Sequence, residues 1–416
     1  TPLYSSAASD VYKRQLEQVR RYWRLLRETI RKQDPRVEVT FNGPGPVIQA
    51  PYEEWTPMPP SLNQETDYAF TEAGSGGEFA TWTRGVSWPR PYKVSFLNPY
   101  SILDPFDPDE IRARVGRTLA EGGQPYRYDQ TSVNGEANPH FVRTWAGIFK
   151  EVQAKEPFVA GAEPVKYAAV VSSEPTMLYR GRADDSSHAK DLVGALRALD
   201  ALHIPHDVLA DWNLKPDLLA AYSMVILPNV ACMTEAQAAA VREYVRDGGA
   251  VFATAETSLF DENGTPRKDF ALADVLGLKL DEAVANTAQR SDRKRPVHLL
   301  PRPGAHPVFA GMPETELMLP GDSVAALTTR GEPAAAVIED AGTPRHSPYR
   351  VTRHAAIHVN AFGKGRAVYV CGSLFARTYH GRRTGIYWPD RLIRNAADWL
   401  APKPPWRVTA AARVWA

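Results

Sequence analysis

The chain opens with apolar residues spaced as on one face of a helix. Between residues 16 and 35 they recur every three or four positions, and a proline ends the pattern. This period predicts an amphipathic helix over 16–35. After it, short β-branched or aromatic runs bounded by turn residues are typical of strands. These runs occupy residues 36–43, 67–73, 93–100 and 124–130.

Two helical patterns with capping residues lie among these strands, at 107–123 and 138–157. The glycine-rich stretch 74–78 is typical of a turn and does not match a phosphate-binding loop. Strands that alternate with helices at this spacing indicate parallel strands joined by crossover helices. We therefore expect residues 16–160 to form a partial (β/α) barrel, about half of the eight strand-helix units of a complete one.

A second series of alternating strands and helices begins after residue 165. Its pattern over residues 166–290 predicts a doubly wound open sheet. A nearly continuous apolar run at 222–230 is typical of a strand buried on both faces. The other elements expected there are strands at 166–173, 206–210 and 250–257 and helices at 188–204 and 234–249. Residues 291–401 predict a small β-rich extension, with a hairpin turned at 363–365 and a last helix at 390–401. Residues 402–416 form a tail without a clear element.

Composition excludes several classes of partner. The 49 lysines and arginines nearly cancel the 48 aspartates and glutamates, so no overall field attracts nucleic acid. No apolar stretch reaches the roughly 18 residues of a membrane helix, and no signal peptide is visible, which predicts no membrane partner and a cytoplasmic location. The two cysteines, Cys232 and Cys371, lie far apart beside apolar runs, so we expect buried, reduced thiols.

The N-terminus is unusual. The chain begins with threonine, and the stretch SSAASDVYKRQ at 5–15 resembles a translated junction that recurs at the ends of metagenomic assemblies. We expect residues 1–15 to be a non-native leader and the natural protein to extend further upstream.

The order of these motifs resembles a known family. A helix is followed by VTFNG, DYAFTEAG, LAEGGQPYRYDQ and then an α/β domain that opens with AAVVSS. The chain resembles the C-terminal half of the barrel and the trimerisation domain of family 42 beta-galactosidases, and more closely their uncharacterised relatives among the hypothetical glycosyl hydrolases. The resemblance is strongest over 166–262 and in GKGRAVYVCGSLF. The α/β domain also resembles the class I glutamine amidotransferase fold.

The resemblance implies a retaining glycosidase that uses no cofactor and acts on carbohydrate. Its nucleophile is a glutamate at the carboxyl end of a late barrel strand, and Glu72 matches that position. Retaining hydrolysis needs two carboxyl groups roughly 5–5.5 Å apart. The family's acid/base glutamate follows an asparagine at an earlier strand end, but no such pair occurs here, and neither Glu54 nor Asp129 matches the motif. We therefore expect a truncated chain with an incomplete catalytic dyad.

Five residues are candidates for substrate binding: Asn42, Trp82, Arg84, Tyr126 and Asp129. Trp82 with Trp88 can stack on a sugar while Arg84 binds hydroxyl groups, although tryptophan and arginine are also ordinary packing residues. Asn42 ends a predicted strand and suits either a substrate hydrogen bond or a turn. The other two candidates lie at the end of the strand predicted over 124–130, with Asp129 on the face opposite Tyr126. Glu72 has an alternative role as an acid that ends a strand.

Two other functions stay open at this stage. One is a non-catalytic oligomerisation or carbohydrate-binding module, because a barrel half without its acid can at best bind sugar. The other is an amidotransferase-like hydrolase at Cys232, which follows a strand but lacks the flanking glycines and later His-x-Glu pair of such enzymes. The ten histidines show no paired metal-ligand spacing. Because a parallel sheet with open edges pairs with other strands or aggregates, we expect a homo-oligomer, a dimer or a trimer.

Overall fold

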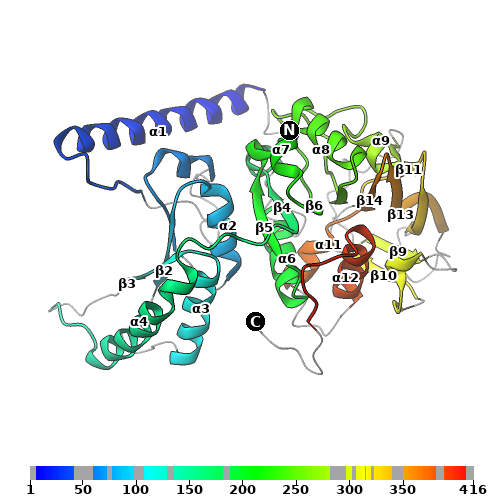
Figure 1. Cartoon of the computed structure of the whole chain (residues 1–416). Helices are drawn as coiled ribbons and strands as arrows, with labels where there is room; N and C mark the ends of the chain where they lie inside the picture. Colours follow the sequence, from blue (N-terminus) through cyan, green and yellow to red (C-terminus); the bar gives the residue numbers. More distant parts are fainter. Residues whose placement is uncertain are drawn as a thin grey trace. The chain divides into compact units, whose positions relative to one another are not determined.

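The chain divides into two compact units, residues 1–165 (unit 1) and residues 166–416 (unit 2). The structure is a computed structural model (Figure 1). It describes residues 6–41, 60–72, 77–97, 107–128, 135–180, 188–281, 297–301, 306–313, 315–319, 323–339, 350–380 and 388–408.

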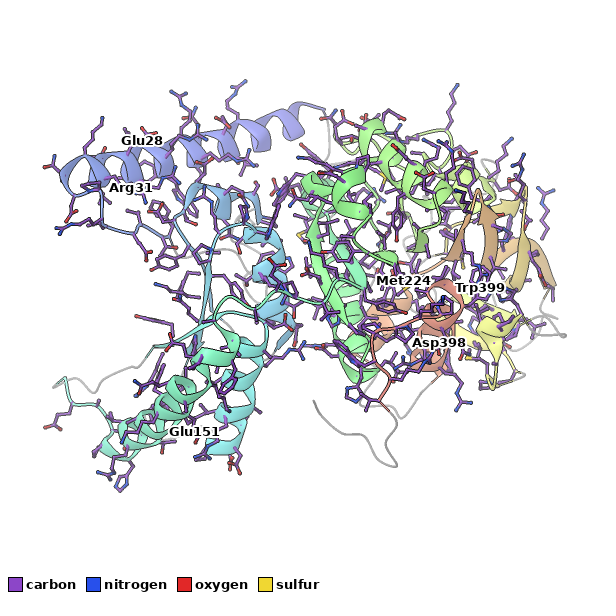
Figure 2. The ribbon with its side chains drawn as sticks, viewed as in Figure 1. Glu28, Arg31, Glu151, Met224, Asp398 and Trp399 are labelled. Atoms are coloured by element: carbon purple, nitrogen blue, oxygen red, sulfur yellow. The ribbon has the colours of Figure 1, made fainter. Side chains whose placement is uncertain are left out.

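Unit 1 alternates strands and helices, as predicted. Its strands form one sheet in the order β1-β2-β3, and both pairings are parallel. A long helix, α1, precedes them and carries charged side chains such as Glu28 and Arg31 (Figure 2). The elements are α1 (Ser6–Gln33), η1 (Pro60–Glu65), β1 (Ala69–Glu72), α2 (Gly77–Ser87), β2 (Tyr92–Leu97), α3 (Pro108–Ala120), β3 (Gln124–Tyr128) and α4 (Pro139–Val159). In the described residues this sheet is open, a part of a barrel and not a closed one.

Side-chain caps fix where two of the crossover helices start. The Asp107 carboxylate accepts a hydrogen bond from the Asp109 amide at the start of α3. The Asn138 side chain accepts hydrogen bonds from the amides of His140 and Phe141 at the start of α4. In both helices a proline occupies the first turn, where its missing N–H costs nothing.

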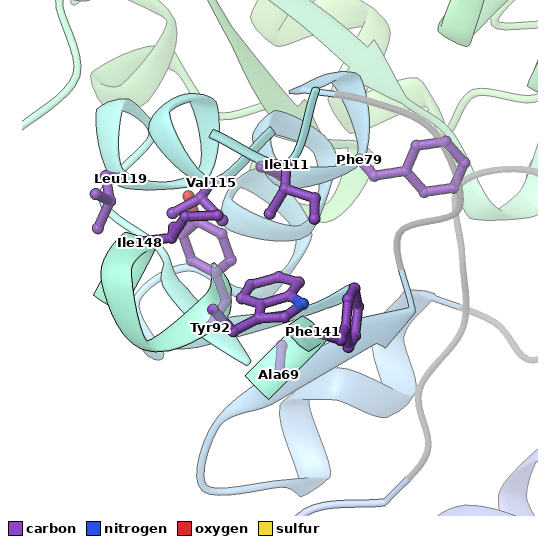
Figure 3. Packing of buried hydrophobic residues seen from close by; sticks show 10 residues of the cluster. Ala69, Phe79, Tyr92, Ile111, Val115, Leu119, Phe141 and Ile148 are labelled. Carbon is purple, nitrogen blue, oxygen red and sulfur yellow. The ribbon is translucent and has the colours of Figure 1, made fainter. Parts of the chain in front are cut away.

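The core of unit 1 lies between the sheet and its helices (Figure 3). Strands β1 and β2 contribute Ala69 and Tyr92, which pack against apolar residues of α2, α3 and α4. An ion pair between Arg112 of α3 and Glu151 of α4, 2.9 Å long, joins these two helices at the surface. The buried cluster comprises Ala69, Phe79, Ala80, Tyr92, Ile111, Val115, Leu119, Phe141, Trp145 and Ile148.

Two local predictions for unit 1 are wrong. The described part of the strand predicted over 36–43, residues 36–41, belongs to no strand ladder. The Asp67 amide donates to the Val39 carbonyl, and the Val39 amide donates to the Asp67 carboxylate, both at 2.9 Å. Of the turn predicted over 74–78, the described residues Gly77 and Glu78 belong to helix α2.

Unit 2 contains a large mixed sheet. Among the described residues nine strands follow the order β10-β9-β12-β13-β14-β7-β6-β4-β5. The pairings from β14 to β5 are parallel and those from β10 to β14 are antiparallel. The parallel part is β4 (Ala168–Ser172), β5 (His206–Ala210), β6 (Met224–Leu227), β7 (Ala250–Thr254) and β14 (Gly365–Val370). The antiparallel part is β9 (Val297–Pro301), β10 (Leu317–Leu319), β12 (Glu332–Glu339) and β13 (Arg350–Phe362), while β8 (Leu278–Leu280) pairs separately with β11 (Ala326–Thr328).

Helices flank this sheet. They are α5 (Glu174–Arg180), α6 (His188–Ala201), η2 (Asp211–Asn213), α7 (Pro216–Leu219), α8 (Glu235–Arg246), α9 (Ala273–Leu276), η3 (Pro307–Phe309), α11 (Leu374–His380) and α12 (Trp388–Leu400). Three of them, α6, α8 and α12, lie where the sequence predicts helices. A capping box between Thr234 and Gln237 starts α8. The apolar strand β6 is fully buried, as its composition predicts.

The predicted hairpin joins β13 to β14. Gly363 has φ +59° there, a left-handed conformation that side chains other than glycine rarely adopt. A Cβ atom on Gly365 would lie 2.1 Å from the carbonyl oxygen of Gly249, so only glycine allows β14 to approach β7 this closely. The hairpin thereby adds the β-rich residues to the parallel sheet.

Candidate functional site

The carboxyl ends of the three parallel strands of unit 1 meet at one edge of the sheet. Glu72, the last residue of β1, is the Cα partner of Ser95 on β2. Ser95 is in turn the Cα partner of Tyr126 on β3. Glu72 therefore ends a strand, as the sequence predicts, and lies in one row with Tyr126. In barrels of this type the active site forms at the carboxyl ends of the strands.

The two faces of this sheet differ. The guanidinium of Arg127 lies 4.3 Å from the centre of the Phe141 ring of α4, so odd-numbered positions of β3 face the helices. Phe70 and Tyr126 contact each other edge to face, with ring centres 5.7 Å apart. Because side chains alternate along a strand, position 72 is on the same face as Phe70 and Tyr126, opposite the helices. In a closed barrel that face is the interior.

The face opposite the helices carries both aromatic and charged groups. Tyr126 is 47% exposed. Lys93 Nζ lies 3.8 Å from the centre of the Tyr68 ring and 3.8 Å from a Glu38 carboxylate oxygen. Burial, together with the charge of Glu38 and the neighbouring Tyr126, raises the pKa of the Tyr68 hydroxyl. An exposed aromatic ring beside a cation and hydrogen-bonding groups is chemistry that suits a sugar.

The other predicted binding residues have different surroundings. Trp82 and Arg84 lie on α2; Trp82 is 0% exposed, and Arg84 forms an ion pair with Glu121. Both side chains therefore serve the packing of unit 1, and their sugar-binding roles stay predictions. Asn42 and Asp129 lie outside the described residues. The side chain of Glu72 is also outside them, so its catalytic role rests on the position of its backbone.

Several features of this edge were not singled out from the sequence. Phe70 and Lys93 are two of them, and the alternation of apolar and polar residues in their strands is the signal that could have found them. Helix α2 is a third feature, because the glycine-rich stretch at its start predicts a turn.

The cysteines are buried thiols, as predicted. Burial raises the pKa of the Cys232 thiol to about 12 and that of Cys371 to about 12. The backbone amide of Cys232 donates to the Thr176 hydroxyl at 3.0 Å. A reactive cysteine needs exposure and a lowered pKa, so this environment argues against a nucleophilic role for Cys232.

Unit 2 holds a buried polar network at the start of α6. The Ser173 amide donates to His188 Nε2 at 2.9 Å, which leaves Nδ1 to donate to the Pro228 carbonyl at 2.7 Å. Asp191, one turn later, accepts a hydrogen bond of 2.9 Å from the Ala376 amide of α11. Burial raises the pKa of Asp191 to about 7 and lowers the pKa of His188 to about 4. Because these side chains are almost completely buried, they do not form an open site.

The described ranges show neither a metal-binding cluster nor a membrane-spanning helix. Histidine, cysteine and carboxylate side chains there do not gather in groups that could bind a metal ion. Nor does any helix in those ranges combine the length and apolarity that crossing a membrane requires.

Known proteins resemble both a part of the sequence and the fold of the chain. Residues 176–297, all in unit 2, match the beta-galactosidase trimerisation domain. No curated protein sequence matches the chain.

Solved structures show the same fold at low sequence identity. The beta-galactosidase from Bacillus circulans sp. alkalophilus has a TM-score of 0.72 at 15% identity, over 95% of this chain and 58% of that one. The beta-galactosidase from the haloarchaeon Halorubrum lacusprofundi has a TM-score of 0.68 at 15% identity, over 97% of this chain and 60% of that one. Alpha-L-fucosidase isoenzyme 2 from Paenibacillus thiaminolyticus has a TM-score of 0.65 at 18% identity, over 92% of this chain and 55% of that one. The chain thus has the fold of part of a beta-galactosidase and spans somewhat over half the length of these structures.

Proposed function

We propose that the protein is a beta-galactosidase-like glycoside hydrolase, in which the carboxyl edge of the unit 1 sheet binds a sugar and Glu72 is the nucleophile. The observation that carries the proposal is the common row of Glu72, Ser95 and Tyr126 at this edge. The likeness of the whole chain to beta-galactosidases supports it.

The chemistry assigned to Glu72 is that of a retaining glycosidase. Its carboxylate attacks the anomeric carbon, a bond forms between the two, and the bond to the leaving oxygen breaks. Water then releases the sugar with its original configuration. The exposed ring of Tyr126, two strands away in the same row, offers a flat apolar surface for the sugar.

Retaining hydrolysis also needs a second carboxyl group that protonates the leaving oxygen. We assign none of the described carboxylates of unit 1 to this role. A leaving group that departs without protonation makes the test of Glu72 independent of the acid. 2,4-Dinitrophenyl β-D-galactoside carries such a group.

The test compares hydrolysis of this substrate by the wild-type chain and by Glu72→Gln. Because the amide cannot attack the anomeric carbon, we expect kcat/KM to fall by about a thousandfold or more. The matched control is Glu163→Gln, an exposed glutamate in the same unit, which should retain wild-type activity. Equal rates for the wild type and Glu72→Gln would refute the assignment.

A second candidate function is a non-catalytic oligomerisation module, and one observation favours it. The family model that matches the chain is the trimerisation domain, over residues 176–297 in unit 2. Under this reading the chain forms a homo-oligomer and does not hydrolyse dinitrophenyl glycosides of any sugar. The hydrolysis assay separates the two functions, because only the hydrolase has a measurable rate that Glu72→Gln can remove.

A further inference from the structure

Helix α1 is attached to the rest of unit 1 through one face that is rich in arginine. Arg24 forms a bidentate ion pair with Glu65 of η1, with distances of 2.6 and 3.1 Å. Arg31 pairs with Asp67 at 2.9 Å. Arg27 donates to the Glu65 carbonyl at 2.8 Å, and Trp23 stacks on Phe41 at the same side. These contacts define which side of α1 faces unit 1.

Another face of α1 exposes an apolar stripe. Val19, Tyr22, Leu25 and Ile30 are 37%, 59%, 60% and 40% exposed. At 100° per residue, Tyr22 and Leu25 point away from the arginine face. An amphipathic helix normally turns its apolar stripe toward a protein core. Here Val19 and Ile30 flank the side that carries Trp23, and Tyr22 and Leu25 lie on the far side, where they are the most exposed of the four. A contiguous apolar patch of this kind marks an interaction surface.

Charged residues border the apolar stripe along one flank. In order along the helix they are Glu17, Arg21, Glu28 and Lys32. Their helical angles place all four on the same side of the stripe. Figure 2 labels Glu28 on this helix. Within the described part of the chain, no ion pair is formed by any of these four side chains.

Along the helix these charges run negative, positive, negative, positive. The same series on a second, antiparallel helix therefore places opposite charges beside each other. If a second α1 lies antiparallel about a two-fold axis between residues 24 and 25, position n faces position 49 − n of the other helix. Arg21 then faces Glu28 of the partner subunit, and Glu17 faces the partner's Lys32. In the stripe, Val19 meets the partner's Ile30. In an antiparallel helix pair the same flanks of the two helices come together, so both ion pairs fall on one side of the seam.

We propose that α1 is a docking surface for α1 of a second copy of this chain, arranged antiparallel across a two-fold axis. Such an interface is isologous, because each contact occurs twice. A parallel arrangement in register would place identical charges at the same level, so the charge order selects the antiparallel one. The interface lies entirely in unit 1. It is therefore independent of the sugar site and of any association through the trimerisation domain of unit 2.

Charge reversal tests both the partner and its orientation. Arg21→Glu places glutamate against the partner's Glu28 at both ends of the interface, and Glu28→Arg places arginine against the partner's Arg21. We expect each single variant to have half the wild-type particle mass in sedimentation velocity. The double variant Arg21→Glu/Glu28→Arg should recover the wild-type mass. An equimolar mixture of the two single variants should recover it as well, because each then faces an opposite charge.

Two further variants complete this experiment. Leu25→Glu should also halve the mass, because it buries a charge in the centre of the stripe. Lys155→Glu, an exposed charge reversal on α4, should leave the mass unchanged. Far-ultraviolet circular dichroism verifies that the variants are folded. The proposal is overturned if the wild type is a single chain, if the single variants keep the wild-type mass, or if neither the double variant nor the mixture restores it.

Discussion

Glu72 on β1 and Tyr126 on β3 lie in the same row of the unit 1 sheet, because each is the Cα partner of Ser95 on the strand between them. Two interstrand spacings separate them, about 10 Å between Cα atoms. At this distance the two side chains do not need to touch each other, but both can reach one bound monosaccharide. The row thus combines a carboxylate and an aromatic ring at the edge where parallel strands end.

Replacing Tyr126 by alanine should weaken sugar binding without unfolding the protein. An aromatic contact contributes about 1 kcal/mol, so we expect the Kd for a galactose-derived inhibitor to rise about fivefold to tenfold. Because Tyr126 is 47% exposed, the free energy of unfolding should change little. Isothermal titration calorimetry measures the Kd. Tyr126→Phe keeps the ring and should bind almost as the wild type does; equal affinities for all three proteins would exclude Tyr126 from the site.

Trp82 should matter for stability. Its side chain is 0% exposed, and replacement of a buried tryptophan by alanine costs about 3–5 kcal/mol. We expect Trp82→Ala to lower the midpoint of urea unfolding of unit 1. Phe158, also aromatic and in unit 1, is 83% exposed, so Phe158→Ala should leave that midpoint almost unchanged. If Trp82→Ala unfolds at the wild-type midpoint yet loses sugar affinity, the sugar-binding role predicted from the sequence gains support over the packing role.

The buried network of unit 2 makes stability depend on pH in two opposite ways. The pKa of Asp191 is raised from 3.8 to about 7, so the folded state holds an extra proton between these values. Its contribution to stability is present below about pH 4 and is lost as the pH rises to about 7. The pKa of His188 is lowered from 6.5 to about 4, so its contribution is present above pH 6.5 and is lost as the pH falls toward 4. The two contributions oppose each other.

In the Asp191→Asn variant, the pH-dependent contribution of His188 to stability should no longer be offset by that of Asp191. Asparagine still accepts the hydrogen bond from the Ala376 amide but does not titrate. We therefore expect the free energy of unfolding to increase more between pH 5 and pH 7 in this variant than in the wild type. Urea titrations at the two pH values measure it. Asp211, whose pKa is also raised to about 7, keeps its contribution in both proteins, and the exposed Asp217→Asn is the control. An unchanged difference between the two pH values would contradict the raised pKa of Asp191.

Much of the fold follows from local sequence signals. The strand predicted over 206–210 is β5 to the residue, and the threonine cap at 234 begins α8 through a capping box. Such elements are predictable because pattern, cap and stop all agree. The position of Glu72 at the end of a strand was predictable for the same reason: the aromatic run before it ends in a glycine-rich stretch.

The rest depends on tertiary contacts that a sequence does not display. α2 was missed because its residues include threonine, valine and glycine, which have low helix propensity, and because packing of Phe79 and Trp82 stabilises it instead. Residues 36–41 have a strand-like pattern, yet Val39 and Thr40 are held by individual hydrogen bonds to Asp67 and Tyr68 and not by a strand ladder. The row that joins Glu72 to Tyr126 is a matter of register between strands more than 50 residues apart.

The most direct test of the central claim is covalent labelling with 2,4-dinitrophenyl 2-deoxy-2-fluoro-β-D-galactoside. The fluorine slows both steps, and the dinitrophenolate leaves without an acid, so a retaining nucleophile stays attached to the sugar. We predict that the intact chain gains the mass of one fluorogalactosyl group and that peptide mass spectrometry locates it on Glu72, with no labelling of Glu72→Gln. An unlabelled wild-type chain, or a label on a different residue, would contradict the assignment of Glu72 as the nucleophile.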